Sequence, residues 1–218
     1  MSFSAISSTA WVADKIKDLT DVDKVDISGQ HLLVVSRTLT PTFKAAVISK
    51  NVVEAADIQS LFEAYDEIDI VVNVPSQARW SRGAVRLCLD AGIAFGGMSA
   101  LTSAIDKHIK NVRTYPGKEL DFVEGGLRQY SRVSEFIRDD ERSYRVERRG
   151  LPAIRVVVLN DYELTGEQVR AARHRYGTFD AILMNNPNGE ATKTAVQIGR
   201  ELKIAILHWR QFLGWLNQ

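Results

Sequence analysis

The residues best suited to contact a nucleic acid lie in a polar connection between a predicted strand and a predicted helix. Trp80 stands there between Arg79 and Arg82. An indole ring stacks on a base of any type, and arginine side chains bind phosphate groups. The spacing predicts a stacking and phosphate-binding loop. The alternative is that Trp80 packs on its own helix or on the other unit.

Lys50 and several further arginines are candidates for phosphate contacts near the ends of predicted strands. Arg148 and Arg149 end an arginine-rich stretch, and Arg37 occupies a comparable place early in the chain. Charge runs are usually solvated faces, and acidic neighbours neutralise them as ion pairs. The stretch has such neighbours in Asp139, Asp140, Glu141 and Glu147.

A second kind of site is predicted where a strand leads into a helix through the residues 185–189. Doubly wound proteins bind ligands beyond the carboxyl ends of their strands, near helix N-termini. The residues that would form a nucleotide site there are Asn186, Asn188, Gly189 and Thr192, with the threonine hydroxyl as a donor to a phosphate. Asn, Pro and Gly also form ordinary tight turns, which need no ligand.

Common catalytic and metal-binding motifs are missing from the sequence. The four histidines are scattered, and the single cysteine, Cys88, lies among apolar helix positions. Neither a zinc cluster nor a disulfide framework is therefore expected. The chain has no Gly-x-Ser-x-Gly, Walker-type or Gly-x-Gly-x-x-Gly motif. We expect no cofactor.

Composition is that of an ordinary globular protein. The 218 residues are 45% hydrophobic and 25% charged, with 28 Lys and Arg against 27 Asp and Glu. A net charge of +1 gives no bulk attraction to nucleic acid or lipid, so such binding depends on local patches. Because no apolar run approaches the roughly 20 residues of a membrane span, and no signal peptide is evident, we expect a cytoplasmic protein without membrane contact.

An internal repeat organises the chain. The sequence aligns with itself without a gap at an offset of 111 residues, which places Pro41 against Pro152 and Asp69 against Asp180. Identities are few, but the apolar positions agree. The repeat predicts two similar units, residues 1–110 and 111–218, packed as a pseudo-dimer.

Each unit is expected to be a mixed α/β unit, because strand–helix–strand links imply parallel pairing. In the first unit the expected elements are a helix at 8–19, strands at 24–28, 31–36 and 43–49, a helix at 52–65, a strand at 68–74, a helix at 81–91 and a strand at 93–96. In the second they are a helix at 118–137, a strand at 154–159, a helix at 166–176, a strand at 179–184, a helix at 192–202, a strand at 204–208 and a helix at 210–216.

This order resembles the restriction-endonuclease-like fold of the PD-(D/E)xK nucleases, and its Mrr-type branch in particular. The match rests on Val47 to Lys50 with the helix that follows, on residues 68–101, and on residues 179–213 of the second unit. The resemblance implies two nuclease-like units in tandem. A Rossmann-like three-layer fold is the alternative, and the hairpin over residues 24–36 argues against it.

The resemblance also implies a catalytic set that this chain lacks in part. In that family carboxylates hold a divalent metal ion, and a lysine at the position of Lys50 orients the attacking water. Ile48 stands where the family has an acidic residue or Gln, and the second unit has Asp161 but no lysine. Glu147 and Asp161 are candidates to share one magnesium or manganese ion, with Lys50 supplied by the other unit. The alternative is that both are exposed carboxylates at strand ends.

The last predicted helix is rich in aromatic residues. Trp209, Phe212 and Trp215 follow helical spacing. They either close the core of the second unit or bind a protein partner or a second copy of the chain.

Together these features favour a non-catalytic protein that binds DNA or RNA, or acts as a scaffold, in a defence or DNA-processing assembly. The alternatives are a metal-dependent nuclease, a nucleotide sensor and a protein-interaction subunit.

Overall fold

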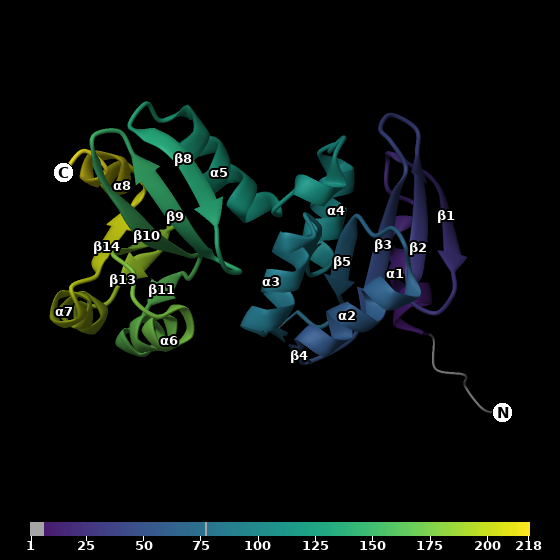
Figure 1. Ribbon diagram of the computed structural model, residues 1–218, viewed down its shortest axis with the longest axis horizontal. Helices are drawn as coiled ribbons and strands as arrows, with labels where there is room; N and C mark the ends of the chain where they lie inside the picture. The colour runs from purple at the N-terminus through teal and green to yellow at the C-terminus, as the bar shows by residue number, and fades with distance from the viewer. Residues whose placement is uncertain (1–6, 77) are drawn as a thin grey trace. The chain divides into compact units, whose positions relative to one another are not determined.

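A computed structural model describes residues 7–76 and 78–218 of the protein. The chain forms two compact units, Met1–Asp121 and Phe122–Gln218 (Figure 1). The sequence-based boundary after residue 110 falls earlier. The structure extends the first unit because the short helix η1 (Val112–Thr114) and Tyr115 contribute to its core.

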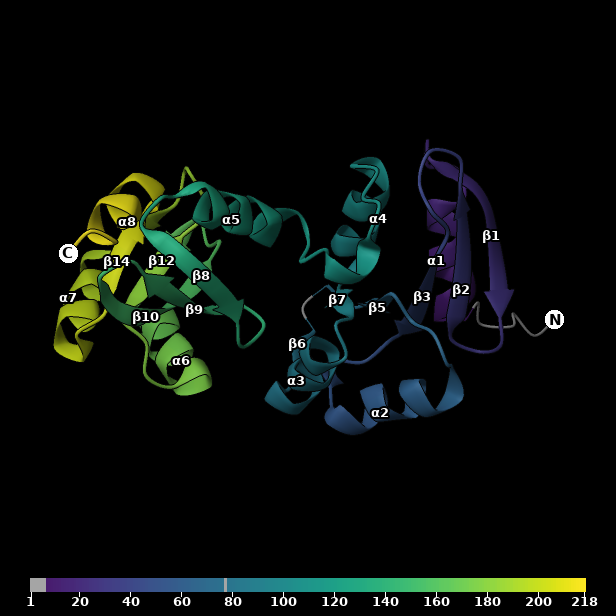
Figure 2. The ribbon, with the colours of Figure 1, turned by 45° about the horizontal axis from the view of Figure 1, so that its top comes forward.

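The first unit is a five-stranded mixed sheet between two helical layers (Figure 2). The strand order is β1 (Val22–Ser28), β2 (Leu32–Arg37), β3 (Phe43–Ile48), β5 (Ile70–Asn73) and β7 (Ala94–Gly96). The first three strands are antiparallel, and the last three are parallel. One face carries α1 (Ser8–Ile16) and α4 (Met98–Asp106), and the other carries α2 (Ala55–Ala64) and α3 (Arg82–Asp90).

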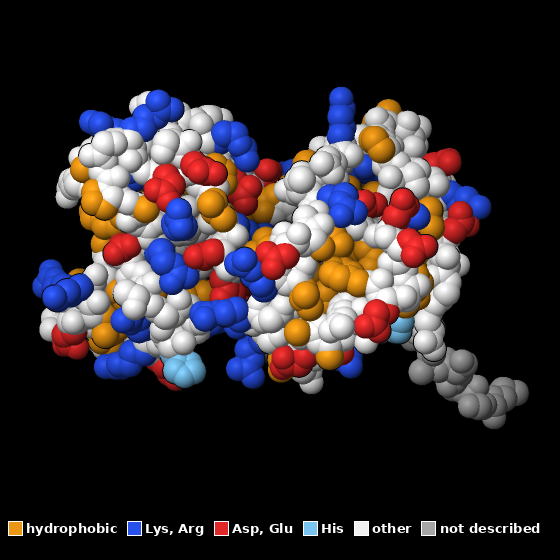
Figure 3. Space-filling view, viewed as in Figure 1, with side chains coloured by type: hydrophobic (Ala, Val, Ile, Leu, Met, Phe, Trp, Pro, Cys, Tyr) orange, Lys and Arg blue, Asp and Glu red, His pale blue; other side chains and the backbone are white. Residues whose placement is uncertain are grey.

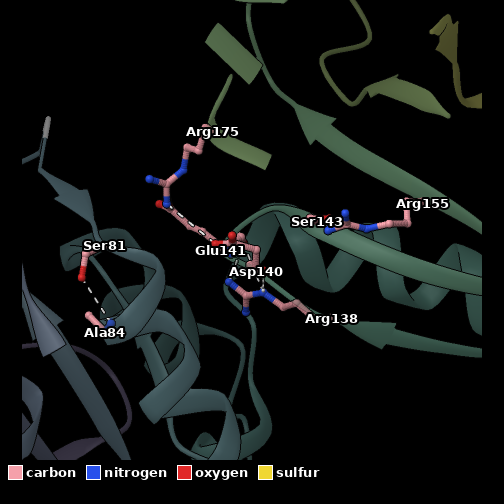
Figure 4. A network of polar contacts seen from close by, with 8 residues as sticks. All are labelled: Ser81, Ala84, Arg138, Asp140, Glu141, Ser143, Arg155 and Arg175. Carbon is pink, nitrogen blue, oxygen red and sulfur yellow. Dashed lines mark hydrogen bonds and ion pairs between the residues drawn. The ribbon is translucent and has the colours of Figure 1, made fainter. Parts of the chain in front are cut away.

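The central strands are buried on both sides, which explains their continuous apolar sequence. Ala45 and Val47 of β3 join the core under α1 and α4, whereas Ala46 and Ile48 join the core under α2 and α3. Helix starts are fixed locally as well. Ser81 caps α3 by accepting a hydrogen bond from the amide of Ala84, drawn in Figure 4.

The second unit has the same strand order. Its strands are β8 (Val133–Arg138), β9 (Ser143–Arg148), β10 (Leu151–Leu159), β12 (Ala181–Met184) and β14 (Ala205–His208). The helices α6 (Gly166–Tyr176) and α7 (Lys193–Leu202) cover one face, and α5 (Lys118–Gln129) and α8 (Trp209–Trp215) lie together on the other. The expectation of an α/β protein with mixed sheets is confirmed.

Individual hydrogen bonds recur at the same offset of 111 residues. The Asp69 carboxylate accepts a bond from the amide of Lys44 at 2.7 Å, and Asp180 accepts one from the amide of Arg155 at 2.7 Å. These bonds anchor a parallel strand pair in each unit. The structural repeat therefore extends to the contacts that hold strands in register.

Three features differ from the sequence-based expectation. The helix expected at 118–137 ends at Gln129, and residues 133–137 of that range belong to the edge strand β8. Helix α4 covers residues 98–106, where no helix was expected. Two small parallel ladders were not expected at all: β4 (Val52–Val53) with β6 (Arg79–Trp80), and β11 (Glu163–Leu164) with β13 (Glu190–Ala191). In the described part of the chain, no helix is both long and apolar enough to cross a membrane.

In each unit the two helices that cover one sheet face, α2 with α3 and α6 with α7, pack closely at a glycine. The glycine lies on a different helix of the pair in each unit. In the first unit a Cβ on Gly83 of α3 would lie 3.1 Å from the Cβ of Ala55 of α2. In the second unit the glycine is on the other helix: a Cβ on Gly166 of α6 would lie 2.5 Å from Ile198 Cδ1 and 2.9 Å from Thr194 Cγ2. Each unit thus keeps one glycine at this crossing.

We expect Gly166→Ala to lower the free energy of unfolding by about 1–3 kcal/mol, because an added methyl overpacks this contact. Thr194→Gly should recover part of that loss when combined with it, since it restores the arrangement of the first unit. Urea unfolding of both single variants and the double variant measures the coupling. Strictly additive changes would show that the two positions do not share the contact.

Candidate ligand-binding site

The second unit contains a cavity of about 790 Å³ at the carboxyl edge of its sheet. This volume is within the usual range for small-molecule sites. Three aromatic rings line it, from Phe122, Tyr162 and Trp209. The polar side chains of the lining belong to Asn185, Asn188, Glu190, His208 and Arg210.

The register of the parallel strands brings these residues together. Leu159, Met184 and His208 are direct neighbours at the ends of β10, β12 and β14. The segments that follow these strands must therefore leave the sheet side by side. They carry Tyr162, Asn185, residues 187–190 and residues 209–210, which form most of the cavity wall.

The Trp209 ring is held in place by α5. A Cβ on Gly126 would lie 2.8 Å from Trp209 Cη2, so only glycine leaves room for the ring. Phe122 contacts the same ring edge to face at 5.5 Å, and Phe212 contacts it at 5.9 Å. The indole is therefore a fixed wall of the cavity.

Two connections of the wall are bound to each other by the β11–β13 ladder. The amide of Glu190 donates to the carbonyl of Tyr162 at 2.9 Å. A Cβ on Gly189 would lie 2.5 Å from the carbonyl oxygen of Asp161, which explains the glycine at this position. The side chain of Asn186 accepts a bond from the amide of Asn188 at 3.0 Å, which fixes the turn between them.

Of the four residues predicted for a nucleotide site, the structure brings Asn188 and Gly189 to the cavity. Asn186 serves the turn. Thr192 caps α7: its hydroxyl accepts a bond from the amide of Ala195 at 3.1 Å and donates to the carbonyl of Leu164 at 3.2 Å. The predicted loop is therefore part of the site, but its helix N-terminus is occupied by its own cap.

The first unit lacks the counterpart of this lining. At the offset of 111 residues, His208, Trp209 and Arg210 correspond to Gly97, Met98 and Ser99. The ring, the imidazole and the guanidinium are thus absent from the equivalent edge. The backbone repeats, whereas the chemistry of the edge does not.

The predicted stacking residue is buried. Trp80 is 4% exposed, belongs to the core under α2 and α3, and packs on Phe95 at 5.1 Å. Its ring is therefore not accessible to a base. It packs in the core that includes residues of its own helix α3 and Phe95 of β7. Arg79 and Arg82 are exposed on either side of it. The two-residue strand β6 directs Arg79 outward and Trp80 inward, as alternation along a strand requires.

Arg37 and Arg148 share a structural role at the end of β2 and β9. Each donates from Nε to a proline carbonyl, Pro41 at 2.8 Å and Pro152 at 2.9 Å. The Arg37 side chain is fully buried, with Asp21 at 4.0 Å, so its predicted phosphate contact is wrong. Burial lowers the pKa of Arg37, and the charge of Asp21 opposes that shift.

Arg148 is only partly exposed, and its Nη1 donates to the carbonyl of Gln218 at 2.8 Å. These bonds hold the segment after α8. Arg149 is exposed.

Glu147 and Asp161, the two carboxylates considered for a shared metal ion, do not form one site. Glu147 lies near the end of β9 that pairs with the start of β10, whereas Asp161 follows the other end of β10. Glu147 pairs with Arg145 at 2.6 Å, and Asp161 accepts a bond from Gln168 at 2.6 Å. Within residues 7–76 and 78–218, no group of three or more His, Cys, Asp or Glu side chains is placed to hold a metal ion.

Lys50, at the position of the lysine in the resembled family, pairs with Asp57 at 3.0 Å. Burial raises the pKa of Asp57, but hydrogen bonds from the Glu54 amide and Lys50 outweigh burial and leave that pKa below its ordinary value. The Asp57 carboxylate is therefore held in its charged form at neutral pH.

The acidic residues 139–141 form ion pairs with some arginines of the second unit, in agreement with the alternative of ion pairing. Glu141 pairs with Arg175 at 3.0 Å and accepts bonds from Arg138 through its carbonyl oxygen (Figure 4). Arg155 pairs with Asp139 at 3.1 Å. On the face seen in Figure 3, cations alternate with acids over this unit rather than gather in one patch.

The aromatic last helix forms core rather than an exposed surface. Phe212 and Leu216 are fully buried, and Trp215 stacks on Phe212 at 6.4 Å. Sequence reasoning treated this helix as core or interface, and so missed that Trp209 and Arg210 line a cavity. Their position directly after an apolar strand was the available signal.

Comparisons with protein-family models, curated proteins and solved structures found no match to this chain. The function of the cavity is therefore argued from its own chemistry.

Two adjacent glycines of α5 provide a matched test of the wall. Gly125→Ala should raise the free energy of unfolding by about 0.5–1 kcal/mol, because its added methyl meets open space and alanine favours a helix. Gly126→Ala should lose that gain and shift the emission of Trp209, because its methyl displaces the ring. Thermal unfolding and tryptophan fluorescence measure both effects. Equal stabilisation by the two changes would contradict the contact.

Proposed function

We propose that the second unit binds a nucleotide, either free or as a unit of a nucleic acid, and that the protein acts by binding rather than by catalysis. The observation that carries this proposal is the cavity, where aromatic rings, amide side chains and a guanidinium converge at one sheet edge.

Each part of a nucleotide finds a suitable group there. A base has a flat face that stacks on an aromatic ring such as Trp209. Amide side chains such as those of Asn185 and Asn188 both donate and accept, as base edges do. Arg210 and His208 offer donors to a phosphate, and the Glu190 carboxylate offers an acceptor to sugar hydroxyl groups.

The charge of the second unit supports an anionic ligand. Phe122–Gln218 contains 15 Lys and Arg against 12 Asp and Glu, a net charge of +3, whereas the first 121 residues contain 13 against 15, a net charge of −2. Thirteen of the 15 cations in the second unit are arginine. Arginine binds phosphate with a planar fork and stacks on rings, which lysine does not.

The proposed origin of both units is a restriction-endonuclease-like fold that has lost its catalytic set. Three antiparallel strands followed by parallel strands with intervening helices support this origin. So do the separation of Glu147 from Asp161 and the engagement of Lys50 by Asp57. The predicted role in nucleic-acid binding is retained in the proposal, but it moves from Trp80 and Arg37 to the cavity.

Titration with nucleoside monophosphates and short oligonucleotides tests the proposal. We expect quenching of tryptophan fluorescence and a rise in melting temperature, because a ligand that binds only the folded state stabilises it. Arg210→Gln should weaken binding about tenfold, the effect of losing one charge-assisted hydrogen bond. The matched control is Arg200→Gln, an exposed arginine outside the cavity lining. Binding that both variants retain, or no response to any nucleotide or oligonucleotide, would refute the proposed site.

A further inference from the structure

The charge of the cavity lining limits the ligand that it can hold. Among the described residues of the lining, Arg210 is the only Lys or Arg and Glu190 the only acid. The charges of these two side chains cancel each other. A nucleoside triphosphate brings about four negative charges, which one guanidinium opposite a carboxylate cannot balance. A phosphodiester carries a single charge per nucleotide, which one arginine can neutralise.

The mouth of the cavity carries exposed aromatic rings. Tyr162 is 75% exposed and Phe122 is 61% exposed, although both line the cavity. A site for one small molecule usually buries most of the ligand among its aromatic residues. Exposed rings beside a groove are instead the stacking platforms of proteins that bind single strands, where each ring supports one base.

The two rings are carried by ordered backbone. Tyr162 precedes β11, and its carbonyl is bound to the amide of Glu190 in the β11–β13 ladder. Phe122 lies on α5, and its ring contacts Trp209 at 5.5 Å. The backbone that carries Tyr162 is thus fixed without a ligand, and the Phe122 ring has a neighbour to pack on.

From these two observations we infer that the ligand is single-stranded nucleic acid. One base enters the cavity against Trp209, its phosphodiester lies at Arg210, and neighbouring bases stack on Tyr162 and Phe122. This inference rests on the proposed function, because it assigns the ligand of the same cavity. The bases of a duplex are paired and stacked on each other, so a double strand cannot supply a base without opening.

The experiment compares ligand length at constant chemistry. Fluorescence anisotropy and tryptophan quenching would be followed with thymidine monophosphate, thymidine triphosphate, the single strands dT2, dT4 and dT8, the ribonucleotide strand rU4, and an eight-base-pair duplex. We expect the affinity to rise about tenfold or more from the mononucleotide to the tetranucleotide, the effect of one additional stacked base. The triphosphate should bind no better than the monophosphate.

Tyr162→Ala tests the stacking platform. The quantity compared is the ratio of the affinity for dT4 to the affinity for the monophosphate, which a general loss of folding would not change. The gain in affinity from monophosphate to dT4 should shrink about tenfold in this variant. Trp11→Ala is the matched control, because Trp11 is the counterpart of Phe122 in the first unit and is 39% exposed. The Trp11→Ala variant should keep the full gain in affinity from the monophosphate to dT4. Melting curves would confirm that both variants are folded.

The outcomes separate this inference from the proposed function. Mononucleotide binding with no gain from length, tighter binding of the triphosphate or of the duplex, or a gain that Tyr162→Ala leaves intact would each overturn the inference and leave the cavity as a nucleotide site. Absence of binding by every probe would overturn both.

Discussion

The candidate site depends on the register of three parallel strands, which all end at the same edge of the sheet. Because Leu159, Met184 and His208 are paired across β10, β12 and β14, the segments that follow them emerge at one edge. The β11–β13 ladder then binds two of these segments together, and Gly126 admits the indole that follows the third. Residues as distant in the sequence as Phe122 and Arg210 therefore line one cavity.

The two units show how far a repeated backbone can differ in chemistry. Strand order, strand-anchoring aspartates and the arginine–proline bonds are common to both. The edge that holds Trp209 and Arg210 in one unit holds Met98 and Ser99 in the other. Side chains that maintain register are thus retained, whereas side chains that face the cavity have diverged.

Much of the fold could be predicted from the sequence, since the repeat and the apolar periodicity report directly on local structure and burial. One exception is β8, an edge strand with little buried surface, whose weak alternation does not distinguish it from the end of the preceding helix. Trp80 was misjudged because charged neighbours in sequence do not report burial in space. The cavity combines segments up to 88 residues apart, from Phe122 to Arg210, and only the strand register reveals that they meet.

The glycine contact between α2 and α3, and between α6 and α7, restricts which helices can be exchanged between the two units. A unit that combined α2 with α7 would place Ala55 against Thr194, and one that combined α6 with α3 would place Gly166 against Gly83. The first would be overfilled and the second would leave a void, and both defects weaken a packed core. Each helix is therefore compatible only with its own partner, α2 with α3 and α6 with α7. Recombination between the two halves of the gene would yield sound hybrids only where a crossover keeps each pair intact.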